Sequence, residues 1–364
     1  MLVTEVGARP LRSLENVEVS LAEGITTILG ENGTGKTNLL EALYFALTGR
    51  SFRSSDRRDL IPFGTPMARA EARVCDEDGA EGRFLASVSR AEGRRHLLDG
   101  AAVDSAGALR RRPPIAVFSP DRLALVKGPP AERRAHLDRF LAARWPSRSE
   151  LRRRFGQVLA QRNAQVARVA AGVAPPADLD SWDMAFAEAA APLLEARAEA
   201  AAELAVPFSE AAGELGLQGV AALAYAPRAE GGAAELLAGL AERRESDLGL
   251  GRSGWGPHLD ELRLTLDAHP LRRFGSQGQQ RLALLALLFA ERAALEAAGR
   301  TPPLLLLDDV MSEIDPPRRS LLTERLAGPG QTLITAADPA SVPAGARGAT
   351  ILMPQGQSGL AAVA

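Results

Sequence analysis

One short stretch of the chain has the residue types and spacing that hold a phosphate group. Residues 30–37 match the pattern G-x-x-x-x-G-K-[ST]. Glycines let successive backbone N–H groups turn toward an anion, and the N-terminus of a following helix adds partial positive charge. We therefore expect a nucleotide-binding loop, with Lys36 on the β- and γ-phosphates and Thr37 as a ligand of Mg²⁺. The binding residues are expected to be Gly30, Glu31, Asn32, Gly33, Thr34, Gly35, Lys36, Thr37 and Asn38.

Two carboxylates follow a run of four leucines toward the other end of the chain. Residues 304–307 are continuously apolar, which is typical of a central parallel strand, and Asp308 and Asp309 come directly after them. Open α/β sheets bind ligands at the carboxyl ends of their strands. Asp308 is therefore predicted to complete the Mg²⁺ shell, and Asp309 is the predicted catalytic residue that polarises water. For this motif alone, a strand that ends in an Asp turn is the alternative.

A third motif, Ser276, Gln277, Gly278 and Gln279, precedes a helical pattern that begins near Leu282. A helix N-terminus with a Ser hydroxyl can bind a second anion. Because the chain already has one phosphate loop, we expect this motif to close the nucleotide site of a partner subunit. An ordinary helix cap is the alternative interpretation.

The elements that must position these motifs predict an α/β protein. Strand patterns occur at residues 2–3, 17–19, 26–29, 115–118, 262–266, 304–307 and 331–335, and several more within 69–103. Residues 39–47 and 282–294 have helical patterns instead. The simplest architecture is an α/β head built from both chain ends.

A mainly helical segment is inserted between the two parts of the head. Residues 131–245 are rich in Ala, Leu, Glu and Arg, and Pro175-Pro176, Pro207 and Pro227 are expected to interrupt their helices. Charge is split within this segment: residues 141–170 hold seven Arg and one acidic residue, whereas 171–250 hold four Arg and fourteen acidic residues. Two oppositely charged solvated faces are one interpretation. The predicted domains are 1–118 and 251–364 for the head and 119–250 for the insertion.

Composition excludes several classes of protein. Among 364 residues, 43 Lys and Arg nearly balance 45 Asp and Glu, so any contact with nucleic acid must come from a local patch. The single cysteine, Cys75, excludes an internal disulfide framework and favours a reducing compartment. No signal-peptide pattern is present, and the longest apolar run is about half of a membrane span. The four histidines share no spacing for a further metal site. We expect a cytoplasmic protein that does not enter a membrane.

Arginine pairs and triplets are candidate contacts for DNA phosphates. A solvated face is the alternative for each of them, because the chain contains only two lysines and is generally arginine-rich. Aromatic residues make up 4% of the chain, which disfavours recognition of single strands by base stacking. The candidates are Arg57, Arg58, Arg110, Arg111, Arg112, Arg133 and Arg134, with residues 152–154 as a further triplet.

The order of the three motifs resembles the ABC ATPases. Lys36 and Ser276 are 240 residues apart, and this large insertion is the arrangement of their SMC-like branch. Within that branch the chain resembles the RecF family of bacterial recombinational-repair proteins over essentially its whole length. The blocks that carry this resemblance are residues 11–14, 30–42, 51–53, 119–121, 125–128, 133–134, 137–138, 256–258, 276–281 and 307–315.

The resemblance implies an ABC-type P-loop ATPase head with a helical arm, and ATP with Mg²⁺ as cofactors. It implies head-to-head dimers that enclose two ATP molecules, duplex DNA as a ligand (gapped or with single-strand/double-strand junctions), and slow, switch-like hydrolysis. It also implies that RecO and RecR are partners in loading RecA. By this resemblance, Ser276 and Gly278 contact the partner's γ-phosphate, Asp315 lies in the D-loop across the dimer, and Arg12 approaches the nucleotide.

Three departures from the family pattern qualify these expectations. Asp309 stands where transporter-type ABC proteins have a longer catalytic Glu, which is compatible with slow hydrolysis. Thr335 stands where the switch His is expected after the last strand. Leu259 follows Gly256-Pro257-His258 where a basic residue is expected.

Two other functions fit the sequence less well. A structural SMC-like tether normally needs long heptad arms, which the proline-interrupted insertion lacks. An ATPase subunit of a membrane transporter needs a short spacing between the phosphate loop and the Ser276 motif, and the observed spacing nearly excludes it.

Overall fold

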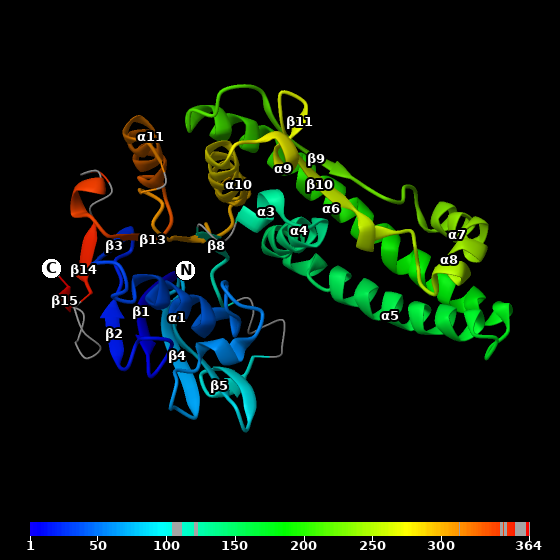
Figure 1. Ribbon diagram of the computed structural model, residues 1–364, viewed down its shortest axis with the longest axis horizontal. Helices are drawn as coiled ribbons and strands as arrows, with labels where there is room; N and C mark the ends of the chain where they lie inside the picture. Colours follow the sequence, from blue (N-terminus) through cyan, green and yellow to red (C-terminus); the bar gives the residue numbers. More distant parts are fainter. Residues whose placement is uncertain are drawn as a thin grey trace. The chain divides into compact units, whose positions relative to one another are not determined.

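In a computed structural model the chain folds into two compact units (Figure 1). The structure describes residues 1–103, 111–119, 123–312, 314–342, 345, 348–353 and 362–363. The first unit contains residues 1–123, 214–216 and 295–364, and the second contains residues 124–213 and 217–294. The first unit is thus an α/β head built from both ends of the chain, as predicted.

Two six-stranded sheets form the head. One has the order β2-β1-β4-β5-β6-β7 and is antiparallel throughout. The other has the order β15-β14-β3-β13-β12-β8 and is parallel except for the β14–β15 pair. The strands are β1 (Leu2–Ala8), β2 (Val17–Ser20), β3 (Ile25–Leu29), β4 (Met67–Cys75), β5 (Glu81–Ser89), β6 (Gly93–Leu98), β7 (Ala101–Ala102), β8 (Ile115–Phe118), β12 (Leu304–Leu307), β13 (Thr332–Ala336), β14 (Ala349–Leu352) and β15 (Ala362–Val363).

The parallel sheet brings the predicted motifs to one edge. Strands β3, β12 and β13 are neighbours, and the register aligns Leu307 with Ile334 and Ala336 with Leu29. The carboxyl ends of the three strands therefore lie together, and the phosphate loop and the two aspartates follow two of them. All four leucines of β12 are buried, as expected for a central parallel strand.

Helix α1 (Lys36–Thr48) begins at the phosphate loop and contributes to the core of the head. It contacts β1, β4 and β5 of the antiparallel sheet and β13 of the parallel sheet. Its leucines, at positions 39, 40, 43 and 47, are fully buried, so apolar packing fixes the helix that presents Lys36 and Thr37. The other helical elements of the head are η1 (Arg57–Leu60), α11 (Pro316–Leu326) and η6 (Pro339–Ser341).

The second unit is mainly helical and includes a three-stranded sheet of order β11-β10-β9. In Figure 1 its long helices α5 and α6 run side by side, and Phe155 of α5 packs on Phe186 of α6 with ring centroids 5.1 Å apart. Its elements are α3 (Ala124–Lys127), α4 (Pro130–Arg144), η3 (Pro146–Arg148), α5 (Leu151–Ala170), η4 (Pro176–Leu179), α6 (Asp180–Glu214), β9 (Ala221–Ala226), α7 (Ala233–Glu242), α8 (Arg244–Leu250), η5 (Pro257–Leu259), β10 (Glu261–Leu266), β11 (His269–Pro270), α9 (Leu271–Phe274) and α10 (Gln277–Ala297).

Two local expectations for the insertion are corrected by the structure. Helix α6 continues through Pro207, which was expected to interrupt it, because the buried face of the helix extends past that residue to Ala212. The alternating segment Ala221–Ala226 forms a strand within the helical region and pairs with β10. This pairing joins residues 261–266 to the second unit. The compact units divide at 123/124 and 294/295, and the domain boundaries at 118/119 and 250/251 remain a prediction.

Among the residues that the structure describes, no helix is both long enough and apolar enough to cross a membrane.

Candidate functional site

The phosphate loop between β3 and α1 needs its glycines for two different reasons. Gly33 and Gly35 have φ angles of 87° and 98°, in the left-handed region that side chains rarely adopt. Gly30 has no room for a side chain, since an added Cβ would lie 2.7 Å from Oγ1 of Thr34. A Cβ on Gly33 would meet open space, so the loop is open on that side.

A cavity of about 240 Å³ lies beside this loop in the head. It is smaller than typical cofactor pockets of about 300–1,000 Å³, so it suits the phosphate groups and metal of a nucleotide rather than the whole molecule. Its lining includes most of the predicted loop residues and both predicted aspartates. The lining residues are Asn32, Gly33, Gly35, Lys36, Thr37, Asn38, Arg53, Asp308, Asp309 and Thr335.

Lys36 supplies a buried cation at the cavity. Its Nζ donates hydrogen bonds to the carbonyl oxygens of Gly30 at 2.7 Å and Glu31 at 2.8 Å. Burial lowers the pKa of Lys36, while the charges of Asp309 and Asp308 act in the opposite direction. The ammonium is thus held on the loop within the field of both aspartates.

Asp308 and Thr37 form a pair of oxygen atoms that could serve as metal ligands. The Thr37 hydroxyl donates to the Asp308 carboxylate at 2.8 Å, and the Thr335 hydroxyl donates to the same Oδ1 at 2.8 Å. Burial raises the pKa of Asp308, and the two hydroxyl hydrogen bonds oppose this shift. Mg²⁺ is commonly held by one or two protein oxygens together with phosphate and water, and this donor pair fits that pattern. No cluster of three or more His, Cys, Asp or Glu suited to another metal occurs in the described part of the chain.

Asp309 is held by its backbone at the cavity. Its φ is 49°, an uncommon value for a residue other than glycine, and its N–H donates to the Thr335 hydroxyl at 2.9 Å. Thr335 therefore donates to one aspartate and accepts from the next. The sequence marks Thr335 only as the residue that replaces a histidine, because its role depends on pairing between β12 and β13.

A buried carboxylate organises two arginines beside the loop. Glu41 is fully buried and accepts two hydrogen bonds from Arg12, at 2.9 and 3.0 Å, and one from Ser51. Arg53 lies 3.6 Å from Glu41, donates to Asn38 at 3.0 Å and lines the cavity. Arg12 does not line it. Arg53, which lies in a block of the family resemblance but is not among the predicted site residues, is thus the second cation at the cavity.

The Ser276 motif lies in the second unit, and three of its four residues are exposed. Ser276 caps α10: its hydroxyl accepts from the Gln279 N–H at 3.2 Å, and the Gln279 side chain accepts from the Ser276 N–H at 2.8 Å. In the head, Asp315 is the N-cap of α11 and forms an ion pair with Arg318. Ser276 and Asp315 are thus both helix caps, and their contacts with a partner subunit remain a prediction.

The arginine candidates for DNA contact differ in their availability. Arg133 is 3% exposed, pairs with Glu261, and donates to the carbonyls of Val126 and Gly128, so it braces the second unit and does not face solvent. Its geometry does not fit the predicted DNA contact. Arg134 donates to the Asp260 carbonyl. In the head, Arg58 pairs with Asp56 and Arg111 with Asp99. Arg110 lies outside the described residues.

A group of four arginines lies near the C-terminal end of α1, and we call it the α1-end cluster: Arg50, Arg57, Arg94 and Arg112. Burial together with the charges of Arg57 and Arg50 lowers the pKa of Arg94. Burial lowers the pKa of His96, and the charges of Arg94 and Arg112 lower it further. The guanidinium groups of Arg94 and Arg112 donate to the carbonyls of Gly49 and Leu47. Arg50 and Arg94 were not among the candidates from the sequence. Their proximity to Arg57 depends on the fold, which places β6 against α1.

Comparison with known proteins extends over nearly the whole chain. The family model "RecF/RecN/SMC N terminal domain" matches residues 2–357. The protein "DNA replication and repair protein RecF" of Kineococcus radiotolerans is 35% identical, covering 96% of each chain. The protein of the same name from an Anaeromyxobacter species is 38% identical, covering 93% of each chain. A solved structure, "recombination mediator protein RecF-ATP in RecFOR pathway", has a TM-score of 0.86 at 25% identity, covering 97% of this chain and 95% of that one.

Proposed function

The chain belongs to the RecF family, within the broader RecF/RecN/SMC N-terminal domain family, and we propose that it is an ATP-dependent DNA-binding factor of recombinational repair. The observation that carries the proposal is the convergence of Lys36, Thr37, Asp308 and Asp309 at one cavity. The names of the relatives support a role in repair, and the ATP-bound structure of a relative supports ATP as the nucleotide.

ATP and Mg²⁺ match the groups at this cavity. Lys36 and Arg53 supply positive charge for phosphates, and Thr37 with Asp308 supplies oxygen donors for Mg²⁺. Bound ATP with Mg²⁺ supplies a γ-phosphoryl group that can be transferred to water. Asp309 would orient that water, and its short side chain is compatible with a weak ATPase that acts as a switch.

ATP is further proposed to join two copies of the chain head to head. The exposed N-terminus of α10 offers backbone N–H groups and the Ser276 hydroxyl to an anion, and the γ-phosphate held by a partner subunit has the matching charge. Asp315 would lie across the same dimer. Each nucleotide would then be held by the phosphate loop of one copy and the Ser276 motif of the other.

Duplex DNA is the proposed ligand of the ATP-bound dimer. The α1-end cluster supports this proposal, since four arginines gather there and the pKa of Arg94 is lowered partly by its like-charged neighbours. A phosphate backbone would relieve that repulsion without any reading of bases. Gapped DNA and single-strand/double-strand junctions are the proposed targets. RecR with RecO would be the protein partners in the cytoplasm, and RecA the protein loaded.

The test is the affinity of a fluorescently labelled duplex for the full chain, with ATP–Mg²⁺ and with ADP–Mg²⁺. We expect binding at least about tenfold tighter with ATP, or ~1.4 kcal/mol. Charge reversal by Arg57→Glu with Arg94→Glu should weaken DNA binding and leave ATP affinity unchanged, whereas Arg95→Glu, at an exposed neighbour outside the cluster, should change little. Equal duplex affinity in both nucleotides would contradict the proposed function.

A further inference from the structure

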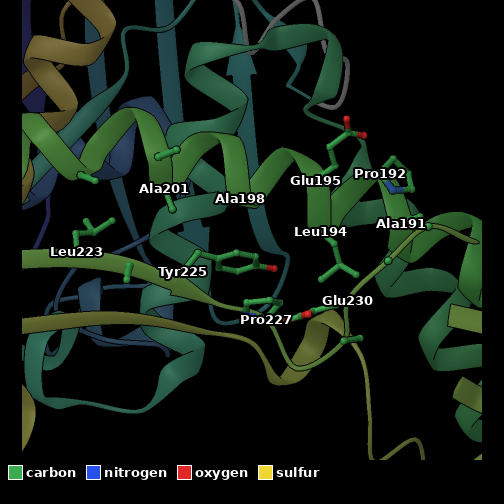
Figure 2. A pocket seen from close by; sticks show the side chains of 16 residues that line it. Ala191, Pro192, Leu194, Glu195, Ala198, Ala201, Leu223, Tyr225, Pro227 and Glu230 are labelled. Atoms are coloured by element: carbon green, nitrogen blue, oxygen red, sulfur yellow. The ribbon is translucent and has the colours of Figure 1, made fainter. Parts of the chain in front are cut away.

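A second cavity, which the proposed nucleotide and DNA sites do not use, lies in the second unit. Its volume is about 830 Å³, and α6 forms one wall while β9 and the loop after it form the other (Figure 2). We call it the α6–β9 groove. Most of its lining is alanine, proline, glycine or leucine, and Tyr225, whose hydroxyl donates to the buried Asp260, lines it as well. Binding pockets commonly have volumes of about 300–1,000 Å³ and mostly apolar linings, and this cavity matches them in both respects.

The helix wall is one continuous face of α6. The lining positions from Ala191 to Ala205 recur every three or four residues, which places them on one side of the helix over about four turns, or ~21 Å. Ala198 and Ala202 lie at the middle of this face and are exposed. Their small side chains leave room for an elongated occupant along the helix.

The strand wall is an unpaired edge. Strand β9 pairs with β10 on one side and is the end strand of its sheet among the described residues. The Asp267 N–H donates to the Val220 carbonyl, so Val220 faces β10 with its backbone groups. In an antiparallel ladder every second residue does so, and the backbone groups of Leu223 and Tyr225 therefore point toward the free edge. Leu223, Ala224 and Tyr225 all line the groove. Because successive side chains alternate between faces, a cavity lined by all three follows the edge of the strand.

The groove has a negative rim. Glu195 and Glu230 are its only charged lining residues, both are exposed, and neither has an ion-pair partner within the described residues. They belong to residues 171–250, which hold fourteen acidic residues and four arginines. This charge repels nucleic acid and attracts a cationic segment.

We propose that the α6–β9 groove binds an extended, basic segment of a partner protein, which adds to β9 as a further strand. Backbone hydrogen bonds to the free edge of β9 would give affinity. Alternate apolar side chains would pack on the alanines of α6, and a Lys or Arg would pair with Glu195 or Glu230. A groove of ~21 Å accommodates about six residues of extended chain.

The test selects peptides from a phage-displayed library of short random sequences for binding to the full chain. Peptides that also bind the variant Ala202→Phe are discarded in each round. Ala202 is exposed, so a phenylalanine there fills the groove without disturbing the core. Selected peptides should have apolar residues at alternate positions and at least one Lys or Arg. A labelled synthetic copy should bind at least about tenfold more weakly to Ala202→Phe, or to Ala198→Phe if the first variant is unstable.

Matched variants separate the groove from general effects. Ala167→Phe, at an exposed alanine of α5, and Glu188→Gln, at an exposed glutamate of α6, should leave peptide binding unchanged. Glu195→Gln with Glu230→Gln should weaken it and reduce its salt dependence. N-methylation of alternate peptide nitrogens should abolish it. The proposal is overturned if selection finds no peptides specific for the wild type, if they are acidic, or if N-methylation has no effect. Self-association that Ala202→Phe abolishes would instead assign the groove to a second copy of the chain.

Discussion

Lys36 is one of two lysines in the chain, and its ammonium lies on the carbonyls of the loop that precedes it. Lys36→Met retains most of the aliphatic volume and removes the charge, so we expect ATP binding to be lost. Lys127→Met, at the other lysine and on an exposed position of α3, should bind ATP normally. Titration calorimetry with ATP–Mg²⁺ measures both, and normal affinity in Lys36→Met would refute the assignment of the phosphate loop.

Thr335 fixes both aspartates through one hydroxyl group. Thr335→Val removes the donor to Asp308 and leaves the Asp309 N–H without its acceptor, so we expect ATP hydrolysis to fall at least about tenfold, since an unpaired buried group costs about 1–3 kcal/mol. Thr332→Val on the same strand is the control, because that buried hydroxyl has no hydrogen-bond partner among the residues that the structure describes. Single-turnover hydrolysis separates this effect from binding. An unchanged rate in Thr335→Val would show that the aspartates do not depend on this hydroxyl.

His96 gives the head a dependence on pH. Burial and the charges of Arg94 and Arg112 lower its pKa below the usual 6.5, while Nε2 hydrogen-bonds the Ala46 carbonyl. The folded state therefore favours the neutral ring. The contribution of His96 to the free energy of unfolding is present above pH 6.5 and is lost as the pH falls through the lowered pKa. In urea unfolding, His96→Asn should weaken the acid dependence of the free energy of unfolding, whereas His269→Asn, at an exposed ring, should not. An identical pH profile in wild type and His96→Asn would contradict this role.

Motif residues could be predicted from the sequence because their spacing is local. Lys36 and Thr37 are adjacent in the chain, and Asp308 follows an apolar run, so each can be identified without the fold. Thr335 and Arg53 could not be assigned this way. Their roles depend on strand pairing and on the buried Glu41, which place them at the cavity from distant parts of the chain.

Elements with strong patterns were predicted, and those held by tertiary packing were not. The leucine spacing of α1 and the apolar run of β12 predict their type correctly. The six-residue β9 is rich in alanine, which has little strand preference, and pairing with β10 determines its structure. Helix α6 passes through Pro207 because its apolar face remains buried, which outweighs the hydrogen bond that proline removes.

The helices of the second unit are joined by a buried ionic cluster. Arg162 of α5 is fully buried and donates to Asp183 of α6 at 2.7 Å, to Asp247 of α8 at 2.7 Å and to Ser253 at 2.6 Å. Arg162→Met leaves the buried Asp247 without its paired cation, while Asp183 keeps its ion pair with Arg244, and the loss should destabilise the protein by about 3–5 kcal/mol. Arg168→Met, at an exposed arginine of the same helix, should cost little. Urea unfolding measures both variants, and similar stability in the two would refute the bracing role.

The whole molecule is nearly neutral, so its binding surfaces depend on local charge. Arginines gather at the end of α1, whereas the α6–β9 groove has only carboxylates at its rim. This separation suits a protein that holds an anionic polymer at one surface and a cationic segment at another.

Dimerisation tests the proposed arrangement of two copies. Ser276→Arg places a bulky cation at the N-terminus of α10, where the helix dipole disfavours positive charge. The same position is where the partner's nucleotide is expected to bind. We expect ATP to bind this variant through its own phosphate loop while ATP-dependent dimers fail to form. Ser181→Arg, at an exposed serine in the first turn of α6, is the matched control. Dimers of Ser276→Arg in ATP would exclude the Ser276 motif from the interface.

Sedimentation velocity of the full chain with a labelled duplex, with and without ATP–Mg²⁺, tests the central claim most directly. The DNA and protein boundaries report binding and assembly in the same experiment. An ATP-gated DNA-binding dimer predicts that the duplex sediments with a dimer only when ATP is present. Duplex that sediments with protein regardless of nucleotide would contradict this account, as would ATP-driven dimers that leave the duplex free.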